Sequence, residues 1–172
     1  MAGEVRALFP GSLAPSGRSA ELSALEQELT QAREGDRARF VFVRGNAGVG
    51  KSHLLRAFRA RASSRGVPFF EGDSPRESHR PYALFTALLR ELLSFSLQAG
   101  VTSEQLSTLQ RRLTPILRES SPLEGAADTD RLTLYDAVVE LFALVSRERP
   151  VVVLPDLDVA DPASLELATA AR

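Results

Sequence analysis

The sequence predicts an α/β fold with a mainly parallel β-sheet. Segments with helical periodicity alternate along the chain with short apolar segments typical of strands. The strand predicted at residues 151–154 has four uncharged residues, VVVL, as expected of a strand that is buried on both faces. A glycine-rich segment, GNAGVGKS, also lies between a predicted strand and a predicted helix, which is the order found around phosphate-binding loops.

Length and composition fit one globular domain and argue against several kinds of site. The chain has 172 residues, 44% of them hydrophobic and 25% charged, so it is long enough to bury a core. It has no cysteine and two histidines, which argues against thiolate and histidine metal sites. The net charge of −1 gives no electrostatic footprint for nucleic acid or an anionic membrane. No segment resembles a signal peptide or a membrane span, so we expect a soluble cytoplasmic protein.

Local signals divide the chain into an arm and a series of helices and strands. Residues 1–16 are rich in Gly, Pro and Ser and lack periodicity, so we predict an N-terminal arm followed by a domain at residues 17–172. Leucine stripes with helical spacing identify the helices, and an Asp161-Pro162 pair is typical of a helix start. The predicted helices cover residues 19–34, 50–64, 81–100, 103–116 and 129–147, and a last helix begins at residue 161. The predicted strands cover residues 40–43, 67–71 and 151–154.

The distribution of basic residues singles out one segment. The chain carries 20 arginines and a single lysine, Lys51, which lies in GNAGVGKS. This segment matches G-x-x-x-x-G-K-[ST], the pattern of phosphate-binding loops, at every fixed position. The residues of this loop are Gly45, Asn46, Ala47, Gly48, Val49, Gly50, Lys51 and Ser52. The alternative is a glycine-rich turn that only caps a helix, and the strand before the motif and the helix after it disfavour that alternative.

Each part of the loop has a chemical task at a bound nucleotide. Glycines permit positive φ angles and a close approach of the backbone to phosphate, and successive N–H groups form a nest for an anion at the positive end of the next helix. We expect the Lys51 amine to reach the β- and γ-phosphates, the Ser52 hydroxyl to ligate Mg²⁺ and the His53 N–H to serve the α-phosphate. The sequence therefore predicts binding of ATP or ADP with Mg²⁺.

The second motif of a phosphate-loop enzyme, an acidic residue that holds Mg²⁺ at the end of a neighbouring strand, is irregular here. The strand at residues 151–154 is followed directly by Pro155, and Asp156 comes one residue later. Because side chains alternate along a strand, Asp156 would point away from Lys51 unless the strand end bulges. Two interpretations stay open for Asp156 and Asp158: acids of a metal site, or solvated loop carboxylates.

The loop and three other segments together resemble one family. The other segments are GRSAEL at residues 17–22, RPYALF at residues 80–85 and residues 149–167, which contain VADPASLEL. The chain resembles the ATPase module of the STAND branch of the AAA-like phosphate-loop NTPases. Such modules occur in large bacterial regulators beside LuxR-type DNA-binding domains, protein-kinase domains or nucleotide-cyclase domains. The resemblance covers nearly the whole chain from Gly17 onward.

The resemblance implies a three-layer phosphate-loop NTPase fold with the strand order 5-1-4-3-2. The three strands predicted above would be strands 1, 2 and 3, and strand 4, strand 5 and the helical lid would be missing, so the domain would be partial. Strands 1 and 3 are then expected to pair directly or to leave a gap. The resemblance also implies that Gly17 and Arg18 lie near the adenine. Asp156 would help to polarise the attacking water, and Pro155 replaces the family's metal-binding acid.

Taken together, these features predict an ATP-binding module of a longer regulator of signalling or transcription. Hydrolysis would be weak or absent, because Pro155 stands where the metal-binding acid is expected. The expected partners are nucleotide and either downstream regulatory or output domains or further copies bound through exposed apolar surface, with no direct contact to nucleic acid or membrane. One alternative is a non-catalytic scaffold or protein-interaction module that keeps the fold, and a more distant one is a small phosphoryl-transfer kinase.

Overall fold

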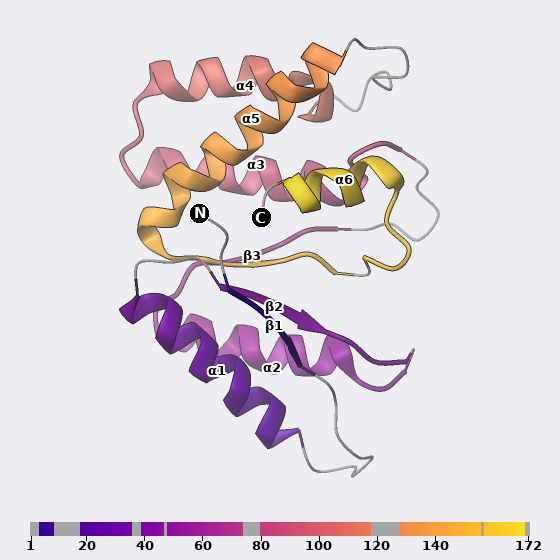
Figure 1. The fold of residues 1–172 in the computed structure, drawn as a ribbon. Helices are drawn as coiled ribbons and strands as arrows, with labels where there is room; N and C mark the ends of the chain where they lie inside the picture. Colours follow the sequence, from indigo (N-terminus) through magenta and orange to yellow (C-terminus); the bar gives the residue numbers. More distant parts are fainter. Residues whose placement is uncertain are drawn as a thin grey trace. The chain divides into compact units, whose positions relative to one another are not determined.

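The computed structural model describes residues 4–8, 18–35, 39–46, 48–73, 80–117, 128–155 and 157–170. Two compact units can be distinguished, Met1–Phe69 and Phe70–Ala171, which we call unit 1 and unit 2. Figure 1 labels most of the helices and strands of both units. Among the described helices, none is both long and apolar enough to cross a membrane.

The described part of unit 1 combines two parallel strands with two helices. Its elements are β1 (Glu4–Leu8), α1 (Ser19–Glu34), β2 (Arg39–Val43) and α2 (Lys51–Ser64). The strands pair in parallel, with Glu4 opposite Arg39 at one end and Leu8 opposite Val43 at the other (Figure 1). Helix α1 packs against α2 and β2. The buried apolar side chains of this unit include Leu25, Leu29, Leu54, Phe58, Ala62 and Val67.

Strand β1 lies within residues 1–16, where we expected an arm. Most of the Gly, Pro and Ser residues behind that prediction follow Leu8, whereas the strand itself, EVRAL, contains none of them. Such a segment can add to a free edge of β2, because backbone N–H and C=O groups on that edge gain hydrogen-bond partners. The prediction of an arm is therefore corrected at residues 4–8.

The described part of unit 2 is mostly helical. Its elements are β3 (Phe69–Glu71, which begins at the boundary between the units), α3 (Ala83–Gln98), α4 (Ser103–Leu117), α5 (Asp128–Val145), the 3₁₀ helix η1 (Ser146–Glu148), β4 (Val151–Val153) and α6 (Pro162–Ala170). Strands β3 and β4 form a second two-stranded sheet. The N–H of Gly72, the residue after β3, donates to the carbonyl of Val153 in β4 at 2.9 Å. Helix α3 packs against α4, α5 and α6.

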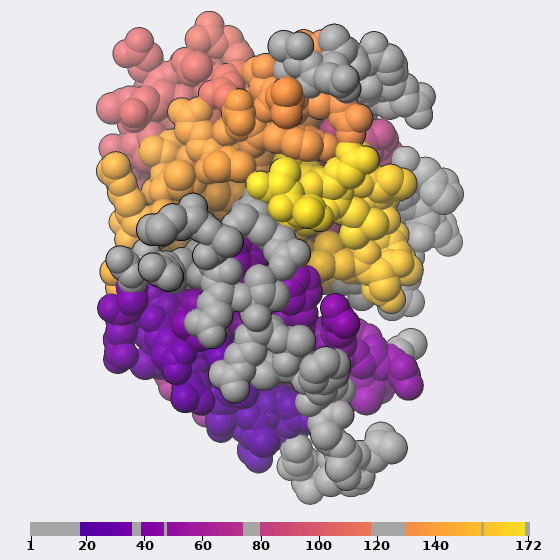
Figure 2. Space-filling model, in the orientation of Figure 1, coloured from indigo at the N-terminus to yellow at the C-terminus, as the bar shows by residue number. Residues whose placement is uncertain are grey.

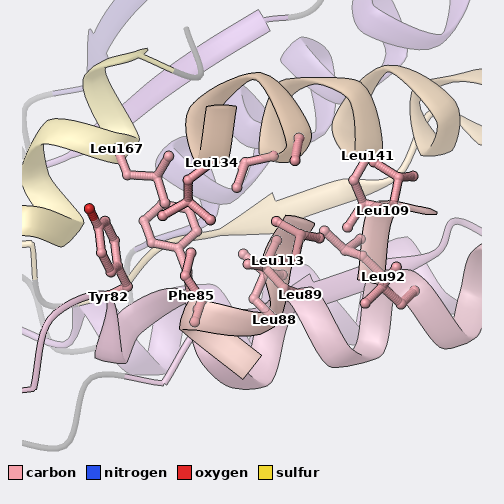
Figure 3. Close-up of a cluster of buried hydrophobic side chains, with 14 of the residues drawn as sticks. Tyr82, Phe85, Leu88, Leu89, Leu92, Leu109, Leu113, Leu134, Leu141 and Leu167 are labelled. Atoms are coloured by element: carbon pink, nitrogen blue, oxygen red, sulfur yellow. The ribbon is translucent and has the colours of Figure 1, made fainter. Parts of the chain in front are cut away.

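The core of unit 2 lies between these four helices. Figure 3 shows leucine and phenylalanine side chains from α3, α4, α5 and α6 pointing toward one another. Fully buried members are Phe85 and Leu88 from α3, Leu113 from α4, Leu141 from α5 and Leu167 from α6. The leucine stripes that predicted the helices are thus the faces that meet in this core.

The described strands form two two-stranded sheets, in which β2 pairs with β1 and β4 pairs with β3. The expectation that the predicted strands 1 and 3 pair directly or leave a gap stays a prediction. The pairing of β3 with β4 agrees with the expected order, in which strands 2 and 3 are neighbours. The α/β class is therefore confirmed in a coarser form, as a mostly helical chain with two short sheets, one of them shown to be parallel.

Candidate functional site

The predicted phosphate loop lies in unit 1, between the end of β2 and the start of α2. Gly48 has φ 75° and Gly50 has φ 92°, both in the left-handed region that side-chain-bearing residues rarely adopt. The Val49 N–H donates to the Asn46 carbonyl at 3.3 Å, which closes a turn inside the loop. The backbone path therefore favours glycine at both positions.

Backbone N–H groups are available where the loop enters α2. The hydrogen bond from the Leu54 N–H to the Gly50 carbonyl, at 3.0 Å, is the first of the helical ladder. The N–H groups of Lys51, Ser52 and His53 precede it and have no helical acceptor. Because these donors lie at the positive end of a 14-residue helix, they favour an anion.

The Lys51 amine lies at the other end of the loop. Its Nζ donates to the Gly45 carbonyl at 2.8 Å and to the Asn46 carbonyl at 3.3 Å. The side chains of Ser52 and His53 are exposed. The loop therefore has the Lys51 ammonium group at its first residues and the N–H donors of α2 at its last ones. Positive groups at both ends of one short segment suit an anionic ligand.

A second cation, Arg18, contacts the loop from the start of α1. Its Nη2 donates to the Val49 carbonyl, and its guanidinium atoms lie 3.6–3.8 Å from the position that a Cβ on Gly50 would take. The structure brings Arg18 to the phosphate loop, and the place near the adenine that the family resemblance implies stays a prediction. No sequence pattern links Arg18 to Val49, because the two residues are 31 positions apart.

Three of the predicted site residues, Gly17, Ala47 and Asp156, lie outside the described residues. Pro155 and Asp158 belong to unit 2, and Asp158 is exposed in the turn after β4. In the part of the chain that the structure describes, no group of three or more His, Cys, Asp or Glu residues could hold a metal ion. The metal-binding roles of Ser52 and Asp156 therefore stay predictions.

In unit 2, two segments that carry the family resemblance meet. Asp161 caps α6, because its Oδ1 accepts the Ser164 N–H at 2.9 Å and its Oδ2 accepts the Ser164 hydroxyl at 2.6 Å. The same Oδ1 accepts the N–H of Tyr82, a residue with φ 62° at the start of α3, at 3.0 Å. The cap was predicted, but the bond to Tyr82, 79 positions away, was not. The bond between Tyr82 and Asp161 thus connects the segments RPYALF and VADPASLEL, at the start of α3 and the start of α6.

The buried Tyr82 side chain lies next to a polar cluster on α5 and α6. Arg131 donates to Glu166, and the Tyr135 hydroxyl donates to Glu166 Oε2 at 3.2 Å. Figure 2 shows α5 and α6 side by side on the surface. Burial, and after it a hydrogen bond with Tyr135, raise the pKa of the Tyr82 phenol to about 12, against an opposing effect of Arg131.

We expect unit 2 to lose stability between pH 10 and pH 12. The folded pKa of Tyr82 lies above the ordinary value of 10.0, so the fold favours the neutral phenol. The stability that unit 2 gains from this raised pKa is fully present below pH 10 and is lost as the pH rises through 12. Thermal unfolding across this range should show a steeper fall of Tm for the wild type than for Tyr82→Phe. Parallel curves for the two proteins would contradict the prediction.

A glycine-dependent loop between a parallel strand and a helix, with a lysine folded across it, defines the class of phosphate-loop nucleotide-binding proteins. The chain belongs to the AAA ATPase domain family, whose family model matches residues 14–171. This membership implies nucleotide binding and a phosphate-loop α/β fold. Neither the curated proteins nor the solved structures with which the chain was compared gave a match.

Proposed function

We propose that the chain is an ATP-binding regulatory module of the STAND branch of AAA ATPases, and that it acts as a switch with weak or absent hydrolysis. The observation that carries the proposal is the loop of unit 1, where the Lys51 amine and the first N–H groups of α2 flank a segment shaped by Gly48 and Gly50. Nucleotide bound there would bias a conformational equilibrium that downstream domains read.

The chemistry of the loop residues supports ATP and its metal ion as the ligand. Lys51 would neutralise charge on the β- and γ-phosphates, and the N–H groups of Gly48, Gly50 and the first α2 residues, Lys51 to His53, would bind phosphate oxygens. The exposed Ser52 hydroxyl would ligate Mg²⁺, which is bound in such sites largely through substrate phosphates. The remaining site residues, Gly17 and Arg18, would complete the nucleotide site from the residues that precede α1.

The sequence after β4 supports weak or absent turnover. Pro155 stands where a metal-binding acid is expected. Asp156 comes one residue later, so in a regular strand its side chain would point to the opposite face of the sheet. Asp156 would then serve at most to polarise water or to hold the metal ion indirectly. The same substitution favours the second candidate function, a non-catalytic scaffold that keeps the fold without turnover.

Exposed apolar side chains in unit 2 support a role in contacts with other domains or copies. Among the described residues of unit 2, the exposed large hydrophobic ones are Leu97, Leu132, Val139, Val159 and Leu165. Surface of this kind is available for downstream domains of a longer regulator or for self-association.

The test is a calorimetric titration of ATP with Mg²⁺ into the wild type, Lys51→Ala and Arg33→Ala. We expect saturable binding by the wild type and a loss of affinity of about 10-fold to 100-fold in Lys51→Ala, because hydrogen bonds to charged groups contribute about 1.5–3 kcal/mol. Arg33→Ala also removes one positive charge, but from the last turn of α1, and should bind as the wild type does.

The outcomes separate the two candidate functions. Equal binding by Lys51→Ala and the wild type would show that the loop is not the nucleotide site. A wild type that is folded by circular dichroism but binds no ATP would favour the scaffold. Binding without phosphate release in a turnover assay would match the proposed switch.

A further inference from the structure

We propose that Arg18 is a positioning residue of the phosphate loop, which holds the peptide group between Val49 and Gly50 in the orientation that phosphate binding needs. The inference rests on the proposed function, because it assigns a task to Arg18 at the same site. It differs from the role implied by the family resemblance, in which Arg18 lies near the adenine.

Arg18 is anchored at both its backbone and its side chain. Its carbonyl accepts the Leu22 N–H at 2.9 Å, which ties the residue to the first turn of α1. Its partly buried side chain reaches the loop, where Nη2 donates to the Val49 carbonyl. The guanidinium also lies over Gly50, with Nε 3.6 Å and Cζ 3.7 Å from the position of a Cβ there.

The contact between Arg18 and the Val49 carbonyl also orients the N–H of Gly50, because both groups belong to the same peptide bond. In a trans peptide the C=O of Val49 and the N–H of Gly50 point in opposite directions, and the described chain has no cis peptide bond. A carbonyl held against Arg18 therefore directs the Gly50 N–H away from the guanidinium. The Gly50 N–H is one of the donors of the predicted anion nest.

Without Arg18, this orientation would be weakly specified. Glycine adopts positive and negative φ with similar ease, so rotation about the Gly50 φ and the preceding ψ can reverse the peptide at little steric expense. The neighbouring Gly48 has φ 75° and offers the same freedom on the other side of Val49. A charged hydrogen bond to the Val49 carbonyl selects one orientation before the ligand arrives, which is preorganisation.

The test combines ATP titration with the amide spectrum of the loop. Proteins labelled with ¹⁵N are compared as wild type, Arg18→Gln, Arg18→Lys and the charge control Arg33→Gln. We expect Arg18→Gln to bind ATP about tenfold more weakly, with an unchanged far-UV spectrum. Its Gly50 amide resonance should differ from the wild type before ATP is added and should move less when ATP is added. Arg18→Lys keeps the charge without the planar fork and should recover only part of the affinity.

Each outcome bears on one hypothesis. A wild type that binds ATP, with an Arg18→Gln variant that binds equally well, overturns the inference and leaves the proposed function intact. Full recovery by Arg18→Lys without recovery of the Gly50 resonance also overturns it, because charge alone would then explain the effect. A wild type that binds no ATP overturns the proposed function. In that case the spectrum without ATP decides the inference, which fails if the Gly50 resonance is the same in the wild type and Arg18→Gln.

Discussion

Replacing Phe85 with alanine should lower the free energy of unfolding of unit 2 by about 3–5 kcal/mol. Phe85 is 0% exposed on α3, and leucines from the neighbouring helices surround it in the core (Figure 3). The substitution removes an aromatic ring from the hydrophobic core. A cavity remains, because the four packed helices can move only partly into the vacated space. No other single truncation that we propose has a larger expected effect on this unit.

The tyrosines provide a local probe for this experiment. The chain contains two tyrosines and no tryptophan, and Tyr82 and Tyr135 both lie in unit 2. Tyrosine fluorescence during urea unfolding therefore follows unit 2 alone. The matched control is Leu132→Ala on α5, a residue that is 63% exposed and should change the stability by no more than about 0.5 kcal/mol. A Phe85→Ala effect as small as the control would refute the assigned core.

Replacing Glu28 with alanine should destabilise unit 1 by about 3 kcal/mol. Glu28 is 4% exposed on α1, and its Oε2 lies 2.6 Å from Arg39 Nε at the start of β2. Loss of the carboxylate removes this charged partner from a guanidinium whose side chain is 19% exposed. Arg39 then keeps its charge in mostly buried surroundings with one carboxylate fewer, and breaking a buried pair costs more than the pair itself contributes.

The same helix supplies the control for Glu28. Glu26 pairs with Arg61 and Arg65 at 3.1 and 3.2 Å, but these arginine side chains are 56% and 48% exposed. Glu26→Ala should therefore cost at most about 1 kcal/mol. Amide hydrogen exchange in α1 and α2 reports on unit 1, which contains no tyrosine. The double variant Glu28→Ala/Arg39→Ala should be less destabilised than the sum of its single variants, and additivity would contradict the coupling.

The parts of the molecule that depend on neighbouring residues were predictable from the sequence. Helix positions followed from leucine spacing, and the loop followed from a strand, a glycine motif and a helix in direct succession. The positive φ angles of Gly48 and Gly50 in the structure favour glycine there, as the motif indicated. Such features are local because each depends on the backbone path of a few residues.

The parts that depend on distant residues were not predictable. The contact of Arg18 with Val49 and the bond of Asp161 to Tyr82 join segments with no shared pattern. The pairing of Glu4–Leu8 with β2 was missed because composition was averaged over 16 residues, which hid a five-residue strand. Tertiary contacts of this kind are chosen by the whole fold, so single-sequence propensity does not reveal them.

The single lysine of these 172 residues also makes the loop chemically addressable. An amine-directed reagent has one side-chain target here, Lys51, besides an α-amino group, because arginine does not react as a primary amine. The Lys51 Nζ is already engaged by the Gly45 and Asn46 carbonyls, and a bound polyphosphate would engage it further. The rate of covalent modification at this one atom therefore reports occupancy of the loop in the unaltered sequence, by mass spectrometry and without any introduced label.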